Sequence, residues 1–149
     1  MQTADVILIG SGQGANPLAG KLAKQGKKVV LFERGHLGGS CVNYGCTPSK
    51  TMISAAYAVG EAKRAAALGV AMEARPDFPK IMERVRSVRD QWREGSGSIE
   101  KQENIHVVHA EARFTGERTV TGGDETWQAE KIVINTGTSA NIPPIEGLE

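Results

Sequence analysis

The two cysteines of the chain, Cys41 and Cys46, are separated by four residues inside a glycine-flanked run from Gly38 to Lys50. Two thiols this close can form one disulfide, and a disulfide that opens and closes carries two electrons. Beside a redox cofactor the pair would be a catalytic dithiol. Without such a cofactor it would be a structural bridge across a short loop, so the surrounding sequence has to decide between these two interpretations.

The size and charge of the chain exclude several classes of protein. Its 149 residues are about enough for one domain, and its net charge of +1 offers no basic patch for nucleic acid or an anionic membrane. It has no apolar run long enough to span a bilayer and no signal segment at Met1. Two cysteines do not make a secreted disulfide scaffold. We therefore expect a cytoplasmic protein with neither nucleic-acid nor membrane partners.

A glycine-rich turn follows the first expected strand, which covers residues 4–9. The turn reads Gly10-Ser11-Gly12-Gln13-Gly14-Ala15 and fits the G-x-G-x-x-G/A pattern. Its first glycine permits a tight turn, its second lets the backbone approach a pyrophosphate, and the small Ala15 lets a helix pack close to the strand. A plain tight turn is the alternative, because glycine turns are common.

The elements that follow this turn favour a dinucleotide site. A helix is expected over residues 13–25, closed by Gly26, and a second buried strand over residues 28–33 ends on Glu33. A carboxylate at that place meets the ribose hydroxyls of an adenosine. Strand, glycines, helix, strand and terminal acid together form one βαβ unit, which is a stronger signal than the glycines alone.

The rest of the chain completes an α/β pattern. We expect a helix over 49–64, an extended piece over 69–72, and a helix opening at Phe78 with Asp77 as its N-cap and a break or kink at 94–98. Short strands follow, over 105–108, 112–115, 118–121, 126–129 and 131–135. The predicted fold is a parallel sheet with helices plus a small antiparallel β-meander.

Three motifs in this order resemble one family over nearly the whole chain. They are the glycine turn with Glu33, the run from Gly38 to Lys50, and Ile134-Asn135-Thr136-Gly137. The chain resembles the N-terminal FAD-binding segment of the class I pyridine nucleotide–disulfide oxidoreductases, which include glutathione reductase, dihydrolipoamide dehydrogenase and mercuric reductase. The cysteine run is the most specific motif and is most similar to mercuric-reductase-like proteins. The resemblance implies a Rossmann-like FAD-binding domain over residues 1–149.

The resemblance also implies roles for single residues. Cys41 matches the interchange thiol, and Cys46 matches the charge-transfer thiol that lies against the flavin. Lys50 matches a lysine near flavin N5; the alternative is an ordinary solvent-exposed lysine on a helix. The implied cofactor-binding residues are Gly10, Gly12, Gln13, Gly14, Ala15, Glu33, Gly39, Ser40, Lys50, Glu111, Ala112, Thr136 and Gly137. No metal site is expected, because the spacing of the three histidines, His36, His106 and His109, resembles no metal cage.

The implied activity belongs to a longer parent protein, expected to be a homodimer. Electrons would pass from NAD(P)H through FAD to a Cys41–Cys46 disulfide, and then to a small-molecule or protein disulfide or an Hg(II)-thiolate. The NAD(P)H domain, the dimerisation domain and its acid–base pair are expected beyond Glu149. The chain alone is therefore expected to bind FAD at most, without complete catalysis.

Two other classes of protein compete with this interpretation. One is a non-catalytic dinucleotide-binding module in which Cys41 and Cys46 form a structural bridge. The other is a flavoprotein such as an FAD monooxygenase that uses the same fold without thiol chemistry. The second leaves the paired cysteines unexplained and ranks below the first.

Overall fold

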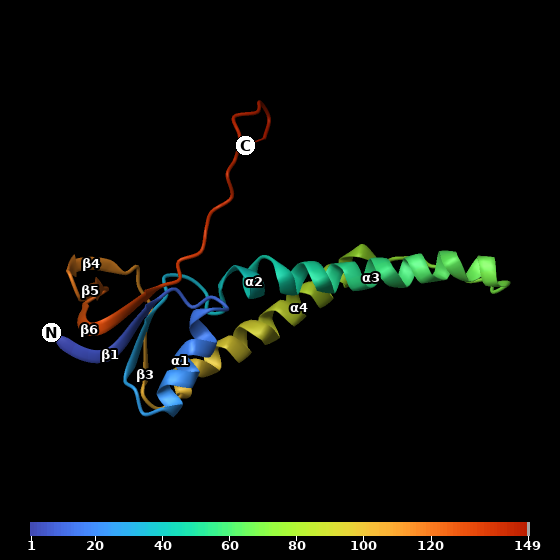
Figure 1. Cartoon of the computed structure of the whole chain (residues 1–149). Coiled ribbons are helices and arrows are strands. Elements are labelled where there is room, and N and C mark those ends of the chain that lie inside the picture. The colour runs from blue at the N-terminus through green and yellow to red at the C-terminus, as the bar shows by residue number, and fades with distance from the viewer. Residues whose placement is uncertain (149) are drawn as a thin grey trace.

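A six-stranded mixed sheet forms one end of the molecule in the computed structural model, which describes residues 1–148 (Figure 1). The strands lie in the order β3-β2-β1-β6-β5-β4. Pairing is parallel between β3, β2, β1 and β6, and antiparallel between β6, β5 and β4. Their bounds are β1 Gln2–Ile9, β2 Val29–Phe32, β3 Ile105–Val108, β4 Arg113–Gly116, β5 Thr119–Gly122 and β6 Glu125–Ile134. The predicted parallel sheet with an antiparallel meander is confirmed.

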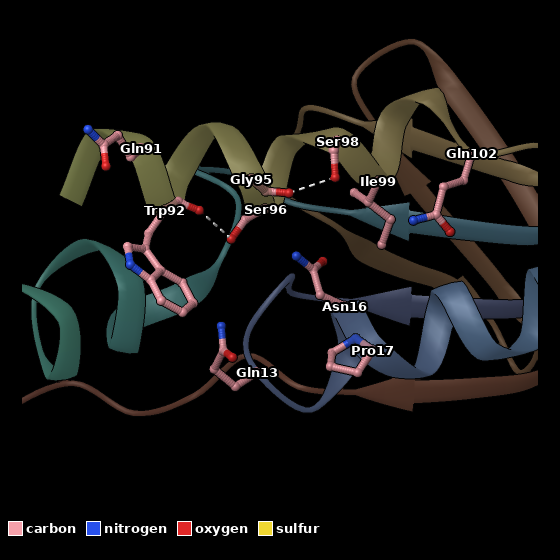
Figure 2. A pocket seen from close by; sticks show the side chains of 10 residues that line it. All are labelled: Gln13, Asn16, Pro17, Gln91, Trp92, Gly95, Ser96, Ser98, Ile99 and Gln102. Carbon is pink, nitrogen blue, oxygen red and sulfur yellow. Dashed lines mark hydrogen bonds between the residues drawn. The ribbon is translucent and has the colours of Figure 1, made fainter. Parts of the chain in front are cut away.

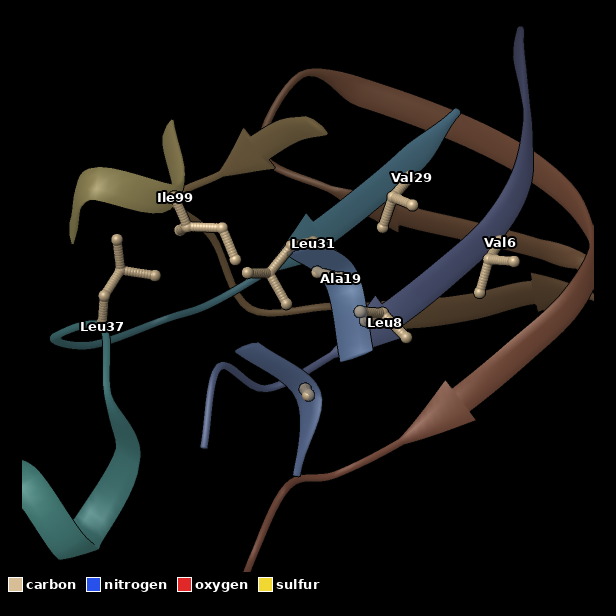
Figure 3. Packing of buried hydrophobic residues seen from close by; sticks show 8 residues of the cluster. Val6, Leu8, Ala19, Val29, Leu31, Leu37 and Ile99 are labelled. Atoms are coloured by element: carbon tan, nitrogen blue, oxygen red, sulfur yellow. The ribbon is translucent and has the colours of Figure 1, made fainter. Parts of the chain in front are cut away.

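The strands β1 and β2 are apolar over residues 6–9 and 29–32 because both of their faces are covered. Alternate side chains of a strand point to opposite faces. One set, which includes Leu8 and Leu31, packs beneath α1 (Ala15–Lys24) and against Ile99 (Figure 3). The other set, which includes Ile7 and Phe32, packs against side chains of the meander such as Trp127. The strands β1 and β2 therefore lie between the helical layer on one face and side chains of the meander on the other.

Small residues bring α1 close to the sheet. Ala15, Ala19 and Ala23 recur every fourth position and are buried, so the helix backbone approaches the strands with little side chain between them. The helix begins at Ala15 and not at the expected Gln13, because residues 12–14 form a turn. In this turn Gly12 O accepts hydrogen bonds from the amides of Ala15 and Asn16. The helix ends at Lys24, ahead of Gly26 with its left-handed φ of 77°.

Two long helices, α3 (Cys46–Ala65) and α4 (Phe78–Gly97), lie side by side and project from the sheet as an arm (Figure 1). The short helix α2 (Gly39–Asn43) connects the sheet to this arm, and the 3₁₀ turns η1 (Ala66–Leu68) and η2 (Ser98–Lys101) follow α3 and α4. Asp77 caps α4 as predicted, since its carboxylate accepts from the amide of Lys80 at 3.2 Å.

The structure corrects some predicted boundaries and confirms another. The helix α3 starts at Cys46 and not at Ser49. The helix α4 ends at Gly97, inside the stretch 94–98 where a break or kink was predicted, and the 3₁₀ turn η2 follows it. Residues 69–72 form no strand, and the two strands expected over 126–135 are the single strand β6. Within residues 1–148, no helix is long and apolar enough to span a bilayer. The domain boundary predicted at Glu149 lies outside the described residues.

Candidate functional site

A cleft of about 640 Å³ opens where the parallel strands end. The residues after β1, β2 and β6 line it together with the first residues of α2, which is where ligands bind in sheets of this type. Eleven of the predicted site residues border this cleft: Gly10, Gly12, Gln13, Glu33, Gly39, Ser40, Cys41, Glu111, Ala112, Thr136 and Gly137. Segments that are far apart in the sequence therefore converge on one cavity.

The glycine turn is packed against the backbone that leaves β6. Gly10 has φ of +91°, and a Cβ there would lie 2.4 Å from the carbonyl oxygen of Asn135. A Cβ on Gly12 or on Gly14 would lie 3.0 Å from the side-chain amide of Asn135. Gly14 and the buried Ala15 do not line the cleft. Gly14 packs against Asn135, and Ala15 of α1 packs in the core. Asn135 lies inside a motif recognised in the sequence, but it was not predicted to be a site residue.

Glu33 is held in the wall of the cleft by backbone and hydroxyl donors. Its Oε2 accepts from the amide of Ser11 at 2.8 Å and from the Ser11 hydroxyl at 2.7 Å, and its Oε1 accepts from the amide of Gly35 at 2.8 Å. Partial burial raises the pKa of this carboxyl, but the hydrogen bonds from Ser11, Gly35 and the Arg34 backbone outweigh burial and lower it overall. The predicted contact of Glu33 with a ribose stays a prediction.

The two cysteines lie at one end of the cleft, on two helices. Cys41 is half-buried in α2 and borders the cleft, whereas Cys46 is the exposed first residue of α3. Both are free thiols. The hydrogen bond between the two thiols is the main cause that raises the pKa of Cys41, followed by burial and by repulsion from Cys46. The spacing thus brings both sulfurs into contact, and their disulfide stays a prediction.

Lys50 lies one turn along α3 from Cys46 and is exposed. Its positive charge and the backbone N–H of Cys46 lower the pKa of Cys41, against the larger causes that raise it. Neither Lys50 nor Cys46 borders the cleft, although the resemblance implied that both contact the flavin. Those two contacts stay predictions.

Three polar side chains that the sequence did not single out organise the turn between Glu33 and Cys41. Ser11 is fully buried, and its hydroxyl accepts from the amide of Gly38 at 3.2 Å. The buried Asn43 donates to three carbonyls of the turn and accepts from Arg93 on α4. The second position of the glycine pattern could have pointed to Ser11. No local signal pairs Asn43 with a residue fifty positions later.

A second cavity of about 420 Å³ lies between the start of α1 and the end of α4 (Figure 2). It is lined by Gln13, Asn16, Pro17, Gln91, Trp92, Gly95, Ser96, Ser98, Ile99 and Gln102. This lining holds no ionisable side chain, and Asn16 Oδ1 has no hydrogen-bond partner within residues 1–148. The side chain of Gln13 borders both cavities, but only the first cavity has the glycine turn that suits a diphosphate.

The histidines do not gather at either cavity. His106 pairs with Glu125 and His109 with Glu100, while His36 borders the first cleft. Across the described residues 1–148, no group of three or more His, Cys, Asp or Glu side chains is placed to hold a metal ion.

Comparison with known proteins agrees with this site. The family model described as pyridine nucleotide-disulphide oxidoreductase matches residues 4–149. A mercuric reductase from Serratia marcescens is 35% identical over 97% of the chain, and a dihydrolipoyl dehydrogenase from Acholeplasma laidlawii is 31% identical over 97%. The chain spans only 33% and 44% of the length of these two relatives.

A solved structure shows the same fold at similar identity. The HOCl-induced flavoprotein disulfide reductase RclA from Escherichia coli superposes with a TM-score of 0.76 and 30% identity, over 95% of this chain and 30% of that one. The match between a family model and nearly every residue from Ala4 onward goes beyond shared fold alone. The chain belongs to the pyridine nucleotide-disulphide oxidoreductase family.

Proposed function

We propose that this chain is the FAD-binding part of a flavin disulfide oxidoreductase. The parent passes electrons from NAD(P)H through FAD to the Cys41–Cys46 pair, and from there to an external disulfide or a metal-thiolate. One observation carries the proposal: a single cleft reaches from the glycine turn at Gly10 and Gly12 to the thiol of Cys41. Family membership implies FAD and NAD(P)H as the cofactors.

Several groups that line the cleft support FAD as its ligand. The glycine turn at the start of α1 presents backbone amides and a helix N-terminus to a diphosphate. Glu33 offers the unused acceptor capacity of its carboxylate to ribose hydroxyls, while Glu111 and Ala112 border the same cleft where the adenine is proposed to lie. Bound there, FAD supplies the two-electron exchange between a nicotinamide and a dithiol.

The two cysteines then act as a dithiol–disulfide couple. Oxidation removes two electrons and two protons from Cys41 and Cys46 and forms one S–S bond, and reduction reverses this. The pKa of Cys41 is raised, first by the hydrogen bond to Cys46 and then by burial. We propose that Cys41 meets the external substrate and that Cys46 faces the flavin, as the family resemblance implies.

Mercuric reductase and dihydrolipoyl dehydrogenase among the relatives suggest two kinds of substrate. One is an Hg(II)-thiolate and the other a small-molecule or protein disulfide. Both are attacked by a thiolate at a sulfur or at a sulfur-bound metal, so one accessible thiol of the pair suits either. We propose a cytoplasmic, homodimeric parent without nucleic-acid or membrane partners.

Absorbance and thiol titration test the proposal. The purified chain mixed with FAD should retain the yellow flavin spectrum after gel filtration, and two thiols should become titratable only after reduction. In the parent, Cys46→Ser should abolish the thiolate-to-flavin charge-transfer band, whereas the matched variant Cys41→Ser should keep it. A non-catalytic module with a structural bridge predicts no such band in either variant or in the unaltered protein, and that result would refute the proposal.

A further inference from the structure

The carboxamide of Asn43 connects the thiol loop to the helix α4. Its Nδ2 donates to the carbonyls of His36, Leu37 and Gly39 at 3.2, 3.1 and 2.9 Å. Its Oδ1 accepts from Nε of Arg93 at 2.8 Å. Three acceptors on one side and a donor on the other fix the orientation of this amide, because Arg has no acceptor and carbonyls have no donor. Asn43 is only 4% exposed, so water does not replace these bonds.

Arg93 is itself held in place on α4. Its Nη1 lies 3.8 Å from Oδ1 of Asp90, and its side chain is 28% exposed. It does not border the cofactor cleft, whereas Asn43 does. The hydrogen bond to Asn43 therefore connects Arg93 to the cleft and to the turn that Asn43 holds.

The turn held by Asn43 is tightly packed on both sides. Gly38 and Gly39 have φ of +102° and +65°. A Cβ on Gly38 would lie 2.8 Å from Ser96 Oγ of α4, and one on Gly39 would lie 2.6 Å from Cα of Gly12. The turn is thus confined between α4 and the glycine turn, and Cys41 follows it by two residues. A shift at Asn43 is therefore transmitted to Cys41.

We propose that Arg93 is a positioning residue of the thiol pair, which acts by holding the Asn43 carboxamide and through it the turn that places Cys41 against Cys46. The inference deepens the proposed function and rests on it for its biological meaning. The measurable consequence does not need the cofactor. Two thiols kept in contact form a disulfide more readily than two thiols on a loosened loop, because their effective concentration is higher.

The test is the equilibrium of the FAD-free chain with glutathione. One glutathione disulfide and the two chain thiols give the Cys41–Cys46 disulfide and two glutathione thiols, so atoms and electrons balance. Arg93→Met removes the donor and should lower this equilibrium constant by about tenfold, which equals about 30 mV for a two-electron couple. Arg93→Gln places an N–H donor where Nε stands and should restore most of the loss.

Arg89→Met is the matched control. Arg89 lies one turn earlier on α4, its side chain is 31% exposed, and its Nη2 lies 2.9 Å from the same Asp90 carboxylate. Its substitution removes a positive charge and an ion pair but leaves the Asn43–Arg93 bond intact. We expect its equilibrium constant to stay within about twofold of the unaltered chain, since exposed ion pairs contribute little.

Equal effects of Arg93→Met and Arg89→Met, or of Arg93→Met and Arg93→Gln, would overturn the proposal. So would loss of the native far-UV circular dichroism spectrum in Arg93→Met, because Arg93 would then be needed for the fold and not for the thiols. Failure of FAD binding in the separate absorbance experiment would refute the proposed function and leave this result standing. The two failures are therefore distinguishable.

Discussion

Replacing Glu33 by glutamine should destabilise the chain even before any cofactor binds. The carboxylate accepts three hydrogen bonds from Ser11 and Gly35 at 2.7–2.8 Å. An amide supplies only one oxygen, so in either orientation its NH₂ group faces at least one backbone N–H. Losing one charge-assisted bond and leaving that donor unpaired costs about 1.5–3 kcal/mol. We expect Glu33→Gln to lower the free energy of unfolding by about 2 kcal/mol at pH 7.

The pH dependence gives this prediction a second, independent check. The hydrogen bonds hold the folded-state pKa of Glu33 below its ordinary value of 4.5. A carboxyl of this kind contributes stability that is fully present above pH 4.5 and is lost as the pH falls through the folded-state pKa. The variant does not titrate at this position. The stability difference between the two proteins should therefore shrink as the pH falls below 4.5.

Urea unfolding followed by far-UV circular dichroism at several pH values measures both effects. Glu111→Gln is the control, because its carboxylate also borders the cleft but is 58% exposed and lies 3.8 Å from Arg113 as its only ion pair in the described residues. We expect that variant to change stability by less than about 0.5 kcal/mol. A loss in Glu33→Gln no larger than in the control, or one that is unchanged between pH 7 and pH 3, would refute the reasoning.

Three further substitutions test other parts of the fold. Gly39→Ala places a Cβ against the glycine turn at a φ of +65°; it should cost about 2 kcal/mol in urea unfolding and abolish FAD binding in a fluorescence titration, whereas tight binding would contradict the packing described. Asp77→Ala removes the cap on the Lys80 amide and should cost about 1 kcal/mol, and an unchanged urea midpoint would show that the cap is idle. Trp127→Phe keeps a buried ring but loses the 2.7 Å bond to Glu125; we expect a loss of about 1 kcal/mol, and equal or higher stability would count against that bond.

The sheet could be predicted because each buried strand carries its own signal. Residues 6–9 and 29–32 are apolar without interruption, as strands covered on both faces must be. Local propensity placed the end of α4 within residues 94–98 but not at its last residue, Gly97. Ser96 Oγ donates to Trp92 O and Ser98 Oγ to Gly95 O, so the serines that normally interrupt a helix bond back to its own carbonyls (Figure 2).

Part of the site could likewise be predicted from the sequence, and part could not. The glycine turn and Glu33 were predictable because their spacing follows from one βαβ unit. The network around Asn43 was not, since it depends on how α4 packs beside α2, and Arg93 is fifty residues away in the sequence. A buried amide of this kind gives no periodic or compositional signal. Its role follows only from the three carbonyls and one guanidinium that surround it.

Ser11 connects the two ends of the cleft. Its hydroxyl donates to Glu33 at 2.7 Å and accepts from the amide of Gly38 at 3.2 Å, and Gln13 donates to the carbonyl of Gly38 at 3.2 Å. The acid proposed for the ribose and the turn that carries Cys41 therefore share one hydrogen-bond network. Each bond formed before a ligand arrives is ordering that binding need not supply. We therefore expect a change at Glu33 to reach the turn before Cys41 through Ser11, so that the two ends of the cleft respond together.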